Sequence, residues 1–231
     1  MAAFTHESAE RLRLDVLALL AMREDEAPRM TYEEFLEWAD EDTLAEWVDG
    51  KVIMASPASL PHQRIVKFLL RTLSTYVEIH QLGEICEAPF QMKLPTSGRE
   101  PDLLFIAANH LDWLKATYLD GLADLAVEVI SPESAERDRG KKFFEYEAAG
   151  VPEYWLLDPD RAVAEFYQVD AQGHYQTIAL DADGLYTSRA LPGFRLRVAW
   201  LWQDPLPDPV DVLLEIDREA YAAYLHGKLE R

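Results

Sequence analysis

Two acidic residues stand in segments of this chain that are otherwise apolar enough to be buried. Asp102 lies in residues 99–106 and Glu128 in residues 124–132. Both segments are short apolar runs bounded by turn-forming residues, a pattern that predicts buried β-strands. A carboxylate in a core strand is costly unless it is paired with, or bound to, a positive charge. The fold must therefore supply a partner for each acid.

A divalent cation is the partner that the two acids favour. Two carboxylates brought together raise each other's pKa, and a cation between them reverses that effect. Mg²⁺ or Mn²⁺ suits oxygen ligands best, so Asp102 and Glu128 are the predicted metal ligands. The alternative is a pair of capped or salt-bridged structural carboxylates. Glu46 is a third candidate ligand, although an alternate, solvent-facing position on a strand explains it equally well.

A helix predicted over residues 134–149 follows the second acidic strand directly. It begins with four basic residues, Arg137, Arg139, Lys141 and Lys142. On an α-helix Lys142 shares a face with Tyr146, so its stem can pack while its ammonium group reaches a phosphate or a water. Lys141 lies about 100° away around the helix, and geometry alone does not exclude it.

The net charge of −20 argues against a nucleic-acid partner, because phosphate binding usually requires a basic surface. The charge is unevenly distributed, however, since residues 1–50 hold fourteen acids and four bases. Bases recur at helical spacing within residues 61–80 and again around the two acids. The candidate nucleic-acid contacts are Arg64, Lys67, Arg99 and Arg139. A solvated helix face explains the first two equally well.

Two further polar residues, His62 and Gln91, have two interpretations each. His62, at the start of a predicted helix, either binds phosphate or orients a water, or is an ordinary surface histidine. Gln91 alternates along a strand and faces either the site or solvent. Cys86, the only cysteine, excludes an internal disulfide and is interpreted as buried filler.

The rest of the sequence predicts that helices and strands alternate along the chain, as in a mixed α/β fold. The expected helices are 6–22, 31–39, 61–80, 110–118 and 210–226. The expected strands are a hairpin over 45–55 around Asp49-Gly50, then 84–87, 90–94 and 153–159, with a β-meander over 162–198. The apolar run 14–22 is too short to span a bilayer and is not flanked like a signal peptide, so a soluble cytoplasmic protein without a membrane partner is expected.

An ordered series of motifs resembles the Uma2 family of endonucleases, within the PD-(D/E)xK, restriction-endonuclease-like superfamily. The series covers residues 30–200 approximately. It consists of Glu46, Val48-Asp49-Gly50, His62-Gln63, Pro101-Asp102, Glu128 to Pro132, Arg137 to Lys142, Tyr146, Gly150-Val151 and Glu153-Tyr154-Trp155. Such an ordered series is far more specific than any one of its motifs.

The resemblance implies an α/β fold with a restriction-endonuclease-like mixed central sheet flanked by helices, a C-terminal β-meander and a closing helix. Residues 30–200 would form the nuclease domain, and residues 1–29 and 201–231 would be helical extensions. The implied activity is magnesium-dependent hydrolysis of phosphodiester bonds in DNA. Superfamily members that cut both strands often act as dimers, so a homodimer is also considered.

The resemblance also assigns roles to single residues. Asp102 and Glu128 would hold the cation, and Glu46 would be an accessory ligand or the ligand of a second metal. The superfamily lysine two residues after the second acid is replaced here by Ile130, a departure from the motif. Lys142, on the following helix, matches the place to which the family is thought to have moved that lysine.

Two other functions remain open from the sequence. A member of the same fold that binds nucleic acid or protein without catalysis would suit the acidic composition. A metal-dependent phosphatase-like enzyme acting on small substrates would need no basic surface. Cleavage of nucleotides but not of polymers would identify the phosphatase-like enzyme. Metal binding would distinguish a nuclease from the non-catalytic binding protein.

Overall fold

The computed structural model describes residues 29–39, 43, 45–54, 57–131, 134 and 137–230. The helix expected over residues 6–22 lies outside these residues. No helix among them is long and apolar enough to cross a bilayer.

A six-stranded mixed sheet forms the centre of the fold. Its order is β11-β10-β9-β8-β6-β3, and only the β8–β9 pair is parallel. The strands are β3 (Gly83–Glu87), β6 (Leu103–Ala107), β8 (Leu125–Val129), β9 (Glu153–Asp158), β10 (Val163–Val169) and β11 (Tyr175–Thr177). The mixed central sheet predicted from the sequence is confirmed.

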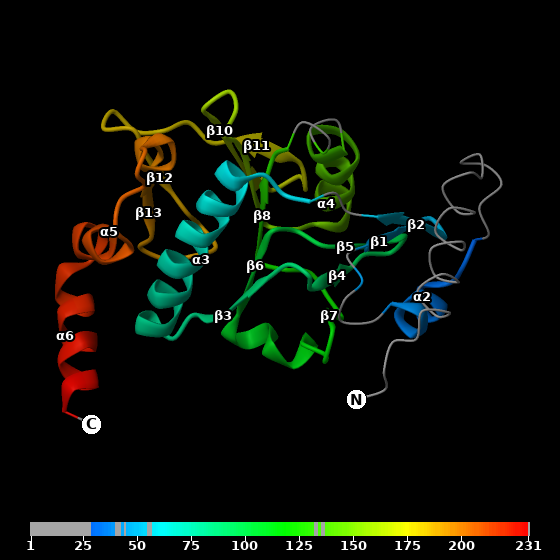
Figure 1. The fold of residues 1–231 in the computed structure, drawn as a ribbon, viewed down its shortest axis with the longest axis horizontal. Helices are drawn as coiled ribbons and strands as arrows, with labels where there is room; N and C mark the ends of the chain where they lie inside the picture. The colour runs from blue at the N-terminus through cyan, green and yellow to red at the C-terminus, as the bar shows by residue number, and fades with distance from the viewer. Residues whose placement is uncertain are drawn as a thin grey trace, which may run out of the picture.

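A second, five-stranded sheet lies at the edge of the molecule that carries Glu46 (Figure 1). Its order is β2-β1-β5-β4-β7, formed by β1 (Ala45–Val48), β2 (Lys51–Met54), β4 (Gln91–Lys93), β5 (Ser97–Arg99) and β7 (Tyr118–Leu119). The predicted hairpin is confirmed: Asp49 and Gly50 both have positive φ, as a two-residue hairpin turn requires. The capping box Thr31–Glu34 starts α2 (Tyr32–Trp38) beside this sheet, as the sequence predicts.

Helices cover both faces of the six-stranded sheet. Figure 1 shows α3 (Leu60–His80) on one side and α4 (Phe143–Ala149) on the other. Alternate strand residues serve the two sides: Phe105 and Val127 pack in a core with Leu69 of α3, whereas Leu104 and Ala126 pack with Tyr146 of α4. Glu128 follows Val127 on β8, so it points to the α4 side.

The C-terminal part of the chain packs against α3. The single helix predicted over 210–226 is wrong. Two helices are present, α5 (Pro209–Ile216) and α6 (Arg218–Leu229). Asp217 separates them, because it leaves the helical conformation and caps α6 by accepting a hydrogen bond from the Ala220 N–H. The end of the predicted meander is a separate ribbon, β12 (Leu185–Thr187) paired with β13 (Arg195–Arg197), followed by a short 3-10 helix, η3 (Val198–Trp202).

Three further predictions about local structure need correction. The strand predicted over 99–106 is divided: β5 ends at Arg99, β6 begins at Leu103, and Asp102 lies in the connection. Pro101 explains the break, because proline has no N–H for a sheet ladder. The helix predicted over 110–118 is the 3-10 helix η1 (Ala108–Trp113) followed by β7. The start of the predicted 134–149 helix is a π-helix, η2 (Arg137–Lys142), which leads directly into α4.

Candidate active site

A cavity of about 410 Å³ lies where the two sheets, the start of α3 and the π-helix meet. Glu46, Asp102, Glu128, His62 and Lys142 all line it. These five come from separate elements spread over nearly a hundred residues of sequence, and the structure brings them together. Their chemical roles stay predictions.

The floor of the cavity is a buried ion cluster around Lys142. Its Nζ donates to Glu128 Oε1 at 2.7 Å and lies 2.9 Å from Glu46 Oε1. Tyr146 Oη donates to the same Glu128 oxygen at 2.9 Å. The lysine side chain is only 3% exposed, so the ammonium group depends on these carboxylates for its stability.

Burial and the neighbouring charges both shift the pKa values of this cluster. Burial disfavours the charged form of Lys142, but Glu128, Glu46 and Asp138 outweigh it and raise the pKa of the ammonium group. Burial, reinforced by Asp138, Asp102 and Glu46, raises the pKa of Glu128 well above its usual value, and Lys142 opposes this only in part. More carboxylates than cations share this space, so an additional cation would be favoured there.

Asp102 and His62 form a second pair at the cavity wall. One Asp102 oxygen accepts the Val129 N–H at 2.7 Å, and the other lies 3.2 Å from His62 Nε2. Burial lowers the pKa of His62, but the hydrogen bond and charge of Asp102 outweigh it and raise that pKa. The other ring nitrogen, Nδ1, is buried and has no hydrogen-bond partner among the described residues. His62 therefore retains a polar atom that is free for a ligand or a water.

Glu46 is held in place by Arg99, a residue predicted to contact nucleic acid. Arg99 donates to Glu46 at 3.0 Å and to Glu145 at 2.6 Å, and its side chain is completely buried. That prediction is wrong, because no part of Arg99 reaches a surface that a polymer could touch. Burial alone would raise the pKa of Glu46, but Lys142 and Arg99 outweigh it and hold this pKa at about 2.

Gln91 faces neither the cavity nor solvent. Its amide nitrogen donates to the Ala45 carbonyl at 3.1 Å and to Glu100 at 3.2 Å, and its oxygen accepts from Tyr32 Oη at 3.0 Å. These bonds position Glu100, which does line the cavity. Burial raises the pKa of Glu100 to about 7. Gln91 is thus a supporting residue behind the cavity wall.

Asp138 is a cavity residue that sequence reasoning missed. It is 1% exposed, and its Oδ1 has no hydrogen-bond partner in the part of the chain that the structure describes. Lys142 Nζ lies 3.6 Å from that oxygen. The available signal was its position four residues before Lys142, which places both on one side of a helix; the basic residues on either side of Asp138 obscured it.

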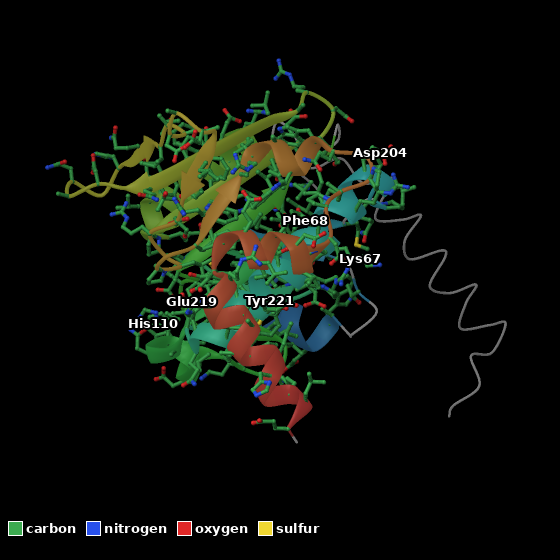
Figure 2. All side chains as sticks on the ribbon, turned by 90° about the vertical axis from the view of Figure 1, so that its left-hand side faces the viewer. Lys67, Phe68, His110, Asp204, Glu219 and Tyr221 are labelled. Carbon is green, nitrogen blue, oxygen red and sulfur yellow. The ribbon has the colours of Figure 1, made fainter. Side chains whose placement is uncertain are left out.

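The remaining candidates lie away from the cavity. Arg139 binds Asp158 at 3.0 Å and also Glu165, and it does not line the cavity. Lys141 is exposed. Of the two lysines that sequence spacing left open, only Lys142 enters the site. Arg64 and Lys67 are exposed on the other side of α3, where they line a second groove, and Figure 2 labels Lys67 there.

The carboxylate side chains of the cavity are suitable ligands for a divalent cation, but their present positions do not form a coordination site. No group of three His, Cys, Asp or Glu side chains within the described ranges is placed to hold a metal ion. Lys142 Nζ occupies the point that Glu46 and Glu128 both approach. The donor set is nevertheless carboxylate oxygen, which suits Mg²⁺ or Mn²⁺. The buried Asp138 Oδ1 has no hydrogen-bond partner among the described residues, although Lys142 Nζ and Arg137 Nε lie 3.6 and 3.8 Å away.

Comparison with known proteins identifies the fold and the family of the chain. The chain resembles a solved structure from Anabaena variabilis, described as "a putative nuclease belonging to DUF820", with a TM-score of 0.64 and 18% identity. The match covers 75% of this chain and 97% of that one, and it shows the fold. No curated protein sequence matches the chain. Residues 32–199 match the Uma2 family, described as "Putative restriction endonuclease". The chain therefore belongs to the Uma2 family.

Proposed function

We propose that this protein is a metal-dependent endonuclease that hydrolyses phosphodiester bonds in DNA. One observation carries the proposal: a buried ammonium group, Lys142, contacts Glu46 and Glu128 at the floor of a cavity that Asp102 also lines. A lysine beside acidic ligands suits phosphoryl chemistry, because catalysis there consists of positioning and charge stabilisation. Membership of a family described as restriction endonucleases supports the same activity.

Asp102 and Glu128 would hold a Mg²⁺ or Mn²⁺ ion, and Glu46 would be an accessory ligand. When bound, the ion would lower the pKa of a nearby water and neutralise charge on the scissile phosphate. Glu128 would have to share its oxygens between Lys142 and the cation. Asp138 Oδ1, which has no hydrogen-bond partner among the described residues, could then accept a hydrogen bond from the displaced ammonium group, which already lies 3.6 Å away.

The protein's own groups have distinct tasks in this mechanism. Lys142, released from part of its carboxylate contacts, would orient the attacking water or stabilise charge that develops on the phosphate. Asp102 is already oriented by the Val129 N–H, so little reorganisation is needed at that ligand. His62 would position Asp102 through Nε2 and present Nδ1 to a water or to phosphate oxygen.

The test combines metal titration with cleavage assays. Calorimetric titration of Mn²⁺ should give binding to the wild type and at least a 10-fold weaker response in Asp102→Asn and Glu128→Gln. Cleavage of labelled DNA in Mg²⁺ should be lost in both variants. The control is Glu84→Gln, an exposed acid on β3, which should behave as wild type. Undiminished metal binding or cleavage in either site variant would refute the ligand assignment.

A second candidate function is binding without hydrolysis. It is favoured by the −20 charge and by Lys142, which already neutralises part of the acidic cluster without a metal. A binding-only protein would not respond to Mn²⁺, and removal of Asp102 or Glu128 would leave its affinity for DNA unchanged or improved. The same titration therefore separates the two functions.

A further inference from the structure

A groove of about 600 Å³ runs along the other side of α3. One wall is formed by the basic side chains Arg64, Lys67 and Arg71. The segment 201–209 forms the facing wall, and Figure 2 shows Asp204 of that segment above Lys67 and Phe68 of α3. The groove thus collects three bases on one helix of a strongly acidic protein.

The charges of this wall are largely available. In the part of the chain that the structure describes, neither Lys67 nor Arg71 forms an ion pair. Arg64 lies 3.7 Å from Asp204, but both side chains are more than half exposed, so the pair is weak. Two exposed cations that no acid among the described residues pairs with point to an external anion.

The groove and the candidate active site lie on different sides of the first turns of α3. His62 lines the cavity, and Arg64, two residues along the same helix, lines the groove. The N-terminal end of α3, capped by Ser59, lies between them. That end of a 21-residue helix carries partial positive charge and favours phosphate. A chain of phosphates could therefore pass from the cavity over the helix end into the groove.

The facing wall supplies apolar surface. It includes Leu201, the partly exposed Trp202 and a proline-rich segment, which also carries the acids Asp204 and Asp208. A cationic groove with an aromatic side chain on one wall is typical of sites for single-stranded nucleic acid, because phosphates meet the charges and bases stack on the ring. A duplex keeps its bases stacked on one another and would leave the apolar wall unused.

We propose that this groove binds the DNA strand flanking the scissile phosphate, as a single strand, with its phosphates on Lys67 and Arg71 and a base against Trp202. The inference rests on the proposed function, which it extends from phosphodiester hydrolysis to a polymeric, locally single-stranded substrate. Asp204 weakens the binding by holding Arg64 and repelling phosphate.

The experiment measures binding without cleavage. A fluorescein-labelled 12-nucleotide single strand is titrated with the full-length protein in EDTA, with fluorescence anisotropy at several NaCl concentrations. Lys67→Gln/Arg71→Gln should weaken binding at least 10-fold and make the slope of log K against log[NaCl] shallower by about 1.4, since each lost phosphate contact contributes about 0.7. Asp204→Asn should strengthen binding several-fold.

A matched control removes the same charge elsewhere. Lys115→Gln/Arg218→Gln changes two exposed cations that do not line the groove and should bind within 2-fold of wild type. Figure 2 shows His110 and Glu219, which are close to them in sequence, far from Lys67. Trp202→Leu should weaken the 12-nucleotide strand but leave its salt slope unchanged. Circular dichroism melting of each variant confirms that it is folded.

The outcomes separate this inference from the proposed function. No binding by wild type, equal losses in the groove and control variants, or tighter binding of a 12-base-pair duplex would overturn the groove proposal. Cleavage of the strand in Mg²⁺ without any groove effect would keep the nuclease and reject the groove. The groove effect without cleavage would keep strand binding and reject hydrolysis.

Discussion

Two buried glutamates on neighbouring parallel strands, Glu128 of β8 and Glu153 of β9, are stabilised by different kinds of partner. Both side chains are almost inaccessible, at 4% and 0% exposure. Glu128 meets Lys142 and Tyr146 at the floor of a cavity. Glu153 has no cation within ion-pair distance in the described structure and accepts only neutral hydrogen bonds.

Both carboxylate oxygens of Glu153 accept hydrogen bonds from several donors. One oxygen accepts from Trp155 Nε1, Tyr186 Oη and Ser188 Oγ at 2.7 to 2.8 Å, and the other accepts the backbone N–H groups of Arg189 and Ala190 at 2.8 and 2.9 Å. These donors tie the central sheet to the β12–β13 ribbon region. Glu153 does not line either the cavity or the groove described above.

The comparison separates a structural carboxylate from a candidate functional one. Burial alone does not distinguish them, and neither does strand position. The difference lies in buried polar atoms without hydrogen-bond partners among the described residues. The cavity that Glu128 lines contains three of them, namely Asp138 Oδ1, His62 Nδ1 and Arg137 Nε. Unsatisfied buried polar atoms are destabilising, and they are expected where a ligand completes them.

The largest effect is expected for Lys142→Met. This change leaves Glu46, Glu128 and Asp138 buried without their shared cation, a loss of about 3–5 kcal/mol in unfolding free energy. Cleavage should fall by at least ~10²-fold if the ammonium group stabilises developing charge. Urea unfolding and DNA cleavage measure the two effects. Lys141→Met, next to it but exposed, is the control, and equal losses in both variants would contradict the assignment.

Glu153→Gln should be the next most damaging. The amide replaces an oxygen that accepts several hydrogen bonds with an NH₂ group facing other donors, which should cost on the order of 3 kcal/mol in unfolding free energy. Mn²⁺ affinity per folded molecule should be unchanged. Thermal melting and Mn²⁺ titration below the melting temperature test both statements. A loss of Mn²⁺ affinity in folded Glu153→Gln would contradict the assignment of Glu153 as a structural carboxylate.

Glu128→Gln should have the opposite effects, with little change in stability and a loss of metal binding. Without metal its stability should lie within about 1 kcal/mol of wild type, because fewer carboxylates then compete for Lys142. At 100-fold excess of Mn²⁺ over its dissociation constant, wild type should gain about 2.7 kcal/mol and Glu128→Gln should gain nothing. Melting curves with and without Mn²⁺ measure the gain. A metal-free loss as large as that of Glu153→Gln would show that both glutamates are structural.

The smallest effect is a pH dependence from Glu100. Burial raises its pKa from 4.5 to about 7, so the folded state binds a proton that the unfolded state has released between these values. Glu100 therefore destabilises the fold progressively as pH rises from 4.5 through 7. Glu100→Gln should remove this slope and be about 1 kcal/mol more stable than wild type at pH 8, after allowance for partial solvent screening. Urea unfolding at pH 5 and pH 8 tests this, and a parallel slope in both proteins would contradict it.

Local rules account for much of the fold that the sequence predicted. The Asp49-Gly50 hairpin, the Thr31–Glu34 capping box and the long helix α3 each depend on residues close together in sequence, and each is present. The apolar pattern also placed Asp102 next to a strand. It did not show that Asp102 lies outside that strand, in the connection where Pro101 interrupts the sheet hydrogen bonds.

The candidate site was predictable only in part. The apolar context of Glu128 showed that it needed a partner, and helical spacing narrowed that partner to Lys142 or Lys141. The choice between them depends on which side of the π-helix faces the sheet. Asp138 was missed and Arg99 was misplaced, because inward or outward direction of a charged side chain is decided by partners distant in sequence, here Lys142 and Glu46.

The sequence by itself thus determined the chain's family, its mixed α/β order and the acids that require neutralisation, since these follow from local patterns. Tertiary structure alone decided which positive charges neutralise the acids and which remain free. Arg99 is completely buried against Glu46 and Glu145, whereas Lys67 and Arg71 remain exposed along a groove. The physical reason is that the free energy of a charge depends on burial and on neighbours brought together only by folding.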